Sequence, residues 1–183
     1  MDAHPFDYAS QYCEENIARL LERPEPAGPR EVVFISNLAQ SCPVWAQRAA
    51  PAPDDPVVWD YHVVLLVDSA RPEIWDLDST LPLPCAALEY LAAAFPLAGH
   101  LPEQHEPRFR LVPEALFRAE FASDRSHMRA EDGSYLAPPP PWPPFRTATA
   151  AMSLPRFFDM KTPGLGQVLD LTGLRARVSR RRG

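Results

Sequence analysis

The sequence predicts an α+β fold in which an antiparallel sheet carries flanking helices. Three observations lead to this prediction: an amphipathic helical segment near the start, β-rich runs joined by short polar links, and an alanine- and leucine-rich segment between them. The chain has 183 residues, of which 46% are hydrophobic, enough for one sizeable core. We therefore expect residues 1–183 to form a single domain.

The first predicted element is a helix in the segment SQYCEENIARLLER, which begins at Ser10. Ile17, Leu20 and Leu21 recur at helical spacing, and Ser10 is a suitable N-cap. Pro24 then ends the helical pattern.

Three β-rich runs come next in the chain. EVVFISN (31–37) has the β-branched and aromatic content of a strand, and a short helical piece is expected around PVWAQRA (43–49). VVWDYHVVLLV (57–67) and EIWDLDS (73–79) are separated only by DSARP, which favours an antiparallel hairpin.

The second half is less regular. CAALEYLAAAF (85–95) has the composition of a helix, and RFRLV (108–112) that of a strand. The stretch APPPPWPPF (137–145) must be extended; it is either a loop held on the domain by Trp142 and Phe145 or a ligand for a peptide-binding module.

The charge and the absence of long apolar runs narrow the classes of function. The formal net charge of −6 argues against nucleic-acid binding, and no stretch has the length of a signal peptide or a membrane span. We expect a monomeric cytoplasmic protein without membrane contact, with the nucleus as a second location. The basic residues of 175–183 suggest a flexible tail, with a localisation signal or an anionic-surface contact as alternatives.

Cysteine and histidine spacing predicts neither disulfides nor a metal or other cofactor. Cys13, Cys42 and Cys85 are odd in number and form no C-x-x-C pair, so each is expected to be a free thiol. The histidines form no H-x-x-x-H or HExxH pattern.

One cysteine has the position of a nucleophile. Cys13 lies near the first turn of the predicted helix, where free backbone N–H groups and the helix dipole stabilise a thiolate. Glu14 and Glu15 act in the opposite direction, because nearby negative charge raises a thiol pKa. A cationic partner would therefore be needed.

His62 is the best candidate for that partner, since a thiolate–imidazolium pair is the usual form of an activated cysteine. Asp76 lies in the strand that the hairpin places beside His62, so Cys13, His62 and Asp76 form a possible triad. Asp60 and Asp78 remain alternatives for the acid, and a buried core role for the cysteine and the histidine also remains open.

Several stretches together resemble the protein N-terminal glutamine amidohydrolase family: YCEENI, VFISN, WDYHVVLL, DLD followed by LPLPC, FASDRSHM and PPPPWP, in that order. The resemblance covers about Tyr12 to Gly166 and implies an α/β sandwich of the papain and transglutaminase type. It further implies Cys13 as nucleophile, His62 as base and Asp76 as the orienting acid. The expected reaction converts N-terminal glutamine of a protein to glutamate with release of ammonia, through a γ-glutamyl thioester, and feeds an N-degron pathway that proceeds through arginylation.

Substrate contacts are less defined. Reading a free α-ammonium calls for a carboxylate, for which Asp124 is the first candidate and Glu14 the second; Asp124 could instead cap a turn. The oxyanion requires donors beyond the backbone N–H of Cys13, and Trp59 or Asn16 is a candidate.

Two other functions remain open at this level. A papain-like protease or a transglutaminase-type acyl transferase would use the same three residues. A non-enzymatic interaction module would instead present the proline stretch to partners.

Overall fold

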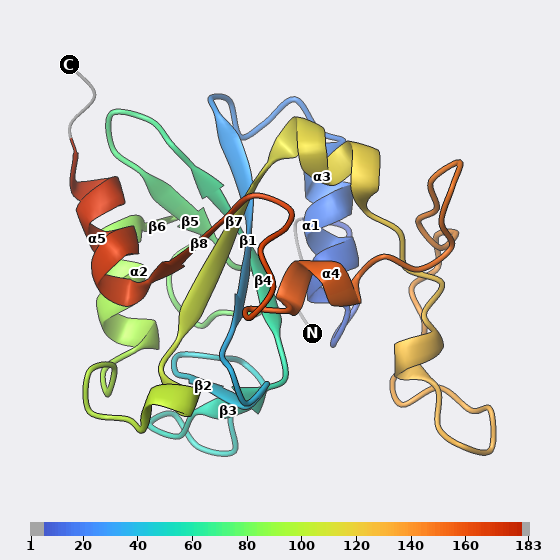
Figure 1. Ribbon diagram of the computed structural model, residues 1–183, viewed down its shortest axis with the longest axis horizontal. Coiled ribbons are helices and arrows are strands. Elements are labelled where there is room, and N and C mark those ends of the chain that lie inside the picture. The colour runs from blue at the N-terminus through green and yellow to red at the C-terminus, as the bar shows by residue number, and fades with distance from the viewer. Residues whose placement is uncertain (1–5, 181–183) are drawn as a thin grey trace.

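A computed structural model describes residues 6–180 and contains a six-stranded antiparallel sheet with helices on both faces (Figure 1). The strand order is β6-β5-β4-β1-β7-β8, and a separate two-stranded sheet pairs β2 with β3. The predicted α+β class is therefore confirmed; its relation to papain-type enzymes stays a prediction. The strands are β1 Arg30–Ser36, β2 Cys42–Val44, β3 Val57–Trp59, β4 His62–Val67, β5 Glu73–Trp75, β6 Cys85–Ala86, β7 Arg108–Pro113 and β8 Gln167–Asp170.

The central strand β1 buries both of its faces. Val32 and Phe34 join one core cluster, while Val33 and Ile35 join the other, as the two-residue period of a strand requires. A strand covered on both sides needs an unbroken apolar run, which VVFI supplies.

Two helical layers cover the sheet. Helices α1 (Cys13–Leu21), α3 (Glu114–Glu120) and α4 (Pro155–Phe158) pack on one face, and α2 (Ala87–Ala94) and α5 (Leu171–Ser179) on the other (Figure 1). Two short 3-10 turns, η1 (Glu103–His105) and η2 (Ser126–Met128), lie in the connecting segments. Within residues 6–180, no helix has the length and apolarity needed to cross a membrane.

The start of α1 differs from the prediction. The helix begins at Cys13 after Tyr12, and no side chain caps it, so Ser10 is not the N-cap. Gln11 has a φ of 66°, which turns the chain immediately before the helix. Cys13 therefore occupies the first helical position, as the nucleophile hypothesis requires.

The prediction of a helical piece around residues 43–49 is wrong. Cys42–Val44 forms β2, which pairs with β3, and Ala46 has a φ of 57°, incompatible with a right-handed helix. The expected strand 57–67 is also divided in two. Asp60 accepts a hydrogen bond from the Tyr61 N–H, and its carbonyl accepts one from Ser36, which bends the chain just before His62.

The β4–β5 hairpin, the helix of 85–95 and the strand of 108–112 are confirmed with shifted bounds. Strand β5 pairs with β4 through Leu65 and Trp75 and ends there, so Asp76 comes after the strand instead of lying within it. The predicted helix begins two residues late, because Cys85 and Ala86 pair with β5 as β6.

The C-terminal region is more ordered than predicted. Residues 167–170 add β8 to the sheet edge, and α5 then covers Leu171–Ser179, with Leu174 and Val178 buried in the core. The flexible tail predicted from Arg175 is therefore wrong for 175–179, because the apolar residues at helical spacing hold that segment on the sheet. Arg181 and Arg182 lie outside the described residues.

Candidate active site

The structure pairs His62 with Asp76. Nε2 of His62 lies 3.0 Å from Oδ1 of Asp76, and both side chains are buried. The other oxygen of Asp76 accepts hydrogen bonds from Gln47 Nε2 at 3.0 Å and from the Tyr90 hydroxyl at 2.8 Å. Of the three acids that the hairpin left open, Asp76 is thus the one bonded to the imidazole.

The electrostatics of this pair raise the proton affinity of the His62 ring. Burial by itself lowers the pKa of His62, but the charge and hydrogen bond of Asp76, together with the charges of Asp78 and Glu14, raise the pKa overall. Burial acts against ionisation of Asp76 as well, yet His62, Gln47 and Tyr90 lower its pKa. The aspartate therefore stays ionised and stabilises positive charge on the ring.

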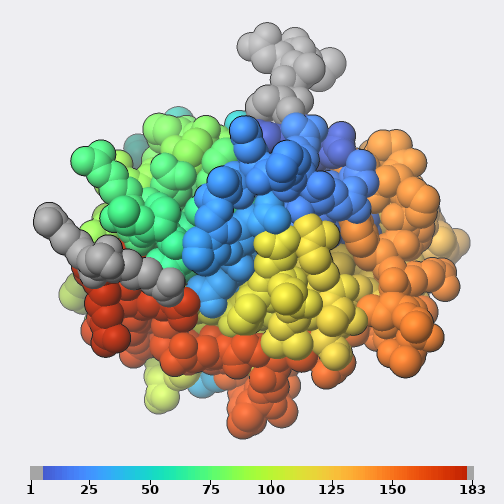
Figure 2. Space-filling view, turned by 90° about the horizontal axis from the view of Figure 1, so that it is seen from above, coloured from blue at the N-terminus to red at the C-terminus, as the bar shows by residue number. Residues whose placement is uncertain are grey.

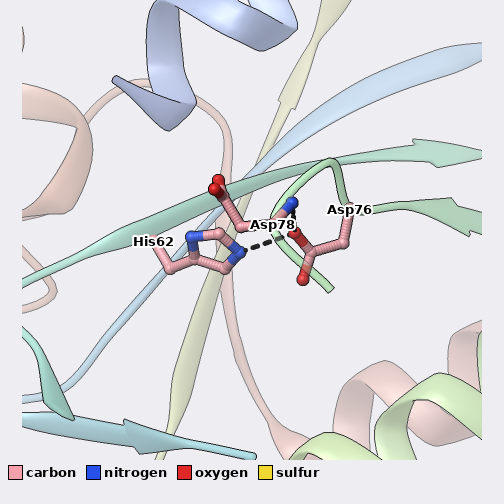
Figure 3. Close-up of side chains that lie close together, drawn as sticks. All are labelled: His62, Asp76 and Asp78. Atoms are coloured by element: carbon pink, nitrogen blue, oxygen red, sulfur yellow. Dashed lines mark hydrogen bonds and ion pairs between the residues drawn. The ribbon is translucent and has the colours of Figure 1, made fainter. Parts of the chain in front are cut away.

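Asp78 is a second carboxylate beside the ring. Its backbone N–H donates to Asp76 Oδ1, whereas its carboxylate turns away from Asp76 (Figure 3) and accepts a hydrogen bond from the Tyr8 hydroxyl. Burial and the neighbouring Asp76 raise the pKa of Asp78.

Donor atoms of His62, Asp76 and Asp78 all lie within 4.8 Å of one another, the only such metal-compatible grouping among residues 6–180. Nε2 of His62 and both oxygens of Asp76 already have protein partners. The arrangement fits an imidazole held in orientation better than a metal centre.

Cys13 lies at the N-terminus of α1, which packs on β4. Its thiol donates a hydrogen bond to Glu14, with Sγ 3.7 Å from Oε2. Burial, followed by the charges of Glu14 and Asp78, raises the pKa of the thiol well above its ordinary value. The resting group is a thiol.

Cys13, the third residue of the predicted triad, lies near the His62–Asp76 pair but is not hydrogen-bonded to it. No hydrogen bond between Cys13 and His62 is present in the described part of the chain, and Nδ1 of His62 is buried without a partner. The ring thus has one nitrogen fixed by Asp76 and one nitrogen available to a reacting group.

A pocket of ≈ 210 Å³ opens on Cys13. Trp59 lines it and stacks on His62, with ring centroids 5.5 Å apart and planes at 16°. The indole Nε1 of Trp59 is buried and has no acceptor. The complete lining is Gln11, Cys13, Trp59, Asp60, Tyr61, His127, Met128 and Leu136.

A larger hollow of ≈ 520 Å³ lies at the start of β1 and holds none of the predicted site residues. Its charged groups pair with one another: Arg30 and Arg118 both bind Glu114. The smaller pocket is therefore the candidate site, because it contains the cysteine.

Of the two carboxylates predicted to read an ammonium, only Glu14 adjoins the pocket. Asp124 does not line it, and its carboxylate accepts the backbone N–H of Ser126, so the turn-capping alternative is the one observed. Asn16 is also unsuited to the oxyanion, because its amide bonds both the N–H and the carbonyl of Ala9.

One wall of the pocket is tied to α1 by a buried clamp. Glu15 accepts two hydrogen bonds of 2.8 Å from Arg125 and one of 2.7 Å from Trp142 Nε1. The clamp holds the segment that carries His127 and the proline stretch. Figure 2 shows residues 125–150, in orange, packed against the N-terminal part of the chain, in blue. The proline stretch is thus packed on the domain, as one of its two interpretations predicted.

Sequence reasoning missed several contributors. Tyr61 and His127 lie within motifs already singled out, beside His62 and Asp124, and this adjacency was the available signal. Gln47 and Tyr90 carried no signal, because they come from distant parts of the chain and meet Asp76 only in the fold.

The site combines a cysteine at a helix start with a buried histidine–aspartate pair on an antiparallel sheet, the arrangement of residues typical of cysteine hydrolases. Comparison with known proteins specifies the family: the profile of N-terminal glutamine amidase matches residues 8–178, and the chain belongs to that family.

Curated relatives agree with this assignment. The chain is 41% identical to protein N-terminal glutamine amidohydrolase of Homo sapiens, over 90% of this chain and 84% of the relative. It is 40% identical to the protein of the same name from Danio rerio, over 90% and 85%. A Drosophila grimshawi protein of that name is 39% identical over 90% and 84%.

Proposed function

We propose that this chain hydrolyses the side-chain amide of an N-terminal glutamine in a protein or peptide, giving glutamate and ammonia. One observation carries the proposal: the cysteine of the pocket lies at a helix start beside a buried histidine whose Nε2 is fixed by Asp76 and whose Nδ1 is free. Membership of the N-terminal glutamine amidase family supports the choice of substrate.

The reaction begins with attack of Cys13 Sγ on the carboxamide carbon. His62 Nδ1 takes the thiol proton, and the tetrahedral intermediate collapses as the imidazolium protonates the leaving nitrogen, which departs as ammonia. A γ-glutamyl thioester remains. Water then gives a proton to His62 and its oxygen to the thioester carbon, which releases glutamate and restores the thiol.

Asp76 acts through the ring. Its hydrogen bond with Nε2 leaves Nδ1 as the base, and its charge stabilises the imidazolium of both intermediates. Since burial and Glu14 raise the pKa of the Cys13 thiol, deprotonation accompanies the attack instead of preceding it.

Two donors suit the oxyanion. The backbone N–H of Cys13 begins an uncapped helix, where the first N–H groups have no intrahelical acceptor. Trp59 also lines the pocket, and its Nε1 lacks an acceptor. Both would gain their partner in the transition state, where such hydrogen bonds lower the barrier most.

The test is ammonia release and mass spectrometry with matched peptides that begin with Gln, Asn or acetyl-Gln. We expect a gain of one mass unit only for free N-terminal Gln, its loss in Cys13→Ala, and its retention in Cys85→Ala, a control whose thiol lies in β6 on the other face. Peptide cleavage, or amine incorporation in place of water, would replace the amidase by a protease or an acyl transferase. No reaction from folded protein would contradict the proposal.

A further inference from the structure

An enzyme for N-terminal glutamine must distinguish a chain end from the many internal glutamines. The distinguishing group is the free α-ammonium, which a nearby carboxylate binds through strong charge-assisted hydrogen bonds. The need for a group that binds this ammonium rests on the proposed function.

Glu14 is an unusual acid within the described chain. Its side chain is 0% exposed, and Oε1 has no hydrogen-bond partner. Among residues 6–180, the one group of possible positive charge within ion-pair distance is His127, with Nε2 at 3.6 Å from Oε1. No lysine or arginine of this region neutralises the carboxylate.

Glu14 nevertheless adjoins the pocket on several sides. Its Oε2 is 3.7 Å from Cys13 Sγ, and its charge raises the pKa of the Tyr61 phenol after the larger effect of burial. Cys13, Tyr61 and His127 all line the pocket. The carboxylate therefore lies directly behind the surface that a substrate would contact.

The next residue shows what the fold does with a purely structural acid. Glu15 is equally buried, and Arg125 and Trp142 satisfy its oxygens. A buried carboxylate without such partners costs stability, because its lost hydration is not replaced. The two neighbours differ in that Oε1 of Glu14 has no hydrogen-bond partner and has only His127, a residue that lines the pocket, within ion-pair distance among the described residues.

We propose that Glu14 binds the α-ammonium of the substrate through Oε1 while the side-chain carboxamide of the same residue reaches Cys13. Four bonds separate the α-nitrogen of glutamine from its carboxamide carbon, so one residue can address both groups. Tyr61 and His127, which line the pocket with Cys13, are hydrogen-bonded to each other at 3.2 Å.

This arrangement also explains selection against asparagine. A pocket that merely senses one methylene discriminates by only about 1–3 kcal/mol. With the ammonium fixed at Glu14, the carboxamide of asparagine falls one bond short of Sγ. The shorter side chain is then misplaced as well as less well packed.

The experiment compares Glu14→Gln with two other charge-neutralising variants, Asp124→Asn and Asp60→Asn. Asp124 caps a turn that asparagine also caps, so this variant should keep the wild-type kcat/KM. Asp60 is an exposed acid at the pocket rim, where an ion pair contributes little, and a change below about fivefold is expected. Glu14→Gln should lower kcat/KM for free N-terminal Gln by roughly 30-fold or more.

A second measurement separates loss of ammonium binding from damage to the nucleophile. Removal of the Glu14 charge lowers the pKa of the Cys13 thiol, so iodoacetamide at neutral pH should alkylate Cys13 faster in Glu14→Gln than in wild type. Circular dichroism and the urea midpoint of unfolding must match wild type, because a displaced helix would also expose the buried Cys13 thiol and speed its alkylation.

A binding measurement tests the role of Glu14 independently of catalysis. In the Cys13→Ala protein, calorimetry should show tighter binding of a free Gln peptide than of its acetylated form, and Glu14→Gln should abolish that difference. An undiminished preference in Glu14→Gln, or its loss in Asp60→Asn alone, would overturn the assignment. Absence of ammonia from wild type would instead reject the proposed function, while the binding preference could still be measured.

Discussion

Helices α1 and α5 have the same length, nine residues each, yet opposite designs. Every residue of α1 except Arg19 is buried, including Glu14, Glu15 and Asn16, and no side chain caps its start. Helix α5 buries only three apolar residues, and Asp170 caps its N-terminus by accepting the N–H of Gly173 at 2.7 Å.

The difference shows where the fold uses its polar groups. In α5 the cap and the apolar stripe serve stability, and most of the remaining positions are exposed. In α1 the helix start, whose N–H groups have no side-chain cap, lies at the pocket. Its acidic residues are buried instead of facing water. We therefore expect changes around α1 to affect activity and stability strongly, and changes in α5 to affect stability alone.

The largest effect on activity is expected for Asp76→Asn. Asp76 lies beside the pocket at which α1 begins. The amide can donate to Nε2 and so favour the wrong tautomer of His62, and it cannot stabilise the imidazolium. By analogy with other triads, kcat for a Gln peptide should fall about 10⁴-fold. Steady-state ammonia release measures it, with circular dichroism to verify folding; a loss below tenfold would remove Asp76 from the triad.

The next effect concerns the clamp between α1 and the pocket wall. Glu15→Ala leaves Arg125 buried without its counter-ion and should lower the free energy of unfolding by about 3–5 kcal/mol, as measured by urea denaturation. Replacing both partners, as in Glu15→Leu with Arg125→Met, should recover part of the loss. Additive losses in the double variant would show that the pair is not energetically coupled.

The pH dependence of stability should be specific to the His62–Asp76 pair. The pKa of Asp76 is lowered on folding, so its contribution is complete above its unfolded value of about 3.9 and is lost as the pH falls through the folded pKa. The pKa of His62 is raised, so its contribution is complete below about 6.5 and is lost as the pH rises through the folded pKa.

The difference in unfolding free energy between wild type and Asp76→Asn should therefore be greatest between about pH 4 and 6.5 and decline on both sides. Urea denaturation across this range measures it. A difference independent of pH would mean that the two side chains are held together by shape and not by charge.

The smallest effects are expected in α5. Asp170→Ala removes the cap and should cost about 1 kcal/mol of stability without a change in kcat. Arg175→Ala, at an exposed position of the same helix, should stay within about 0.5 kcal/mol of wild type. Thermal denaturation with parallel activity assays checks both, and a loss of activity in either variant would contradict the division between the helices.

Local pattern was sufficient for much of the fold. The apolar spacing of α1, the β-branched runs of β1 and β4, and the short link between β4 and β5 are properties of neighbouring residues, so the sequence predicts them. The pattern failed where tertiary contacts override it, as at β2, where pairing with β3 replaces the expected helix.

For the site, the motifs identified the types of chemical group: a cysteine at a helix start, a histidine at the head of a buried strand, and a choice of acids after the hairpin. The choice between those acids came from the packed fold, which also brings Tyr90 and Gln47 to Asp76 and leaves Glu14 beside the pocket while Asp124 caps a turn. The two kinds of information differ in range along the chain. Helix and strand preferences depend on residues a few positions apart, whereas hydrogen bonding and burial at a site depend on side chains that only the packed fold brings together.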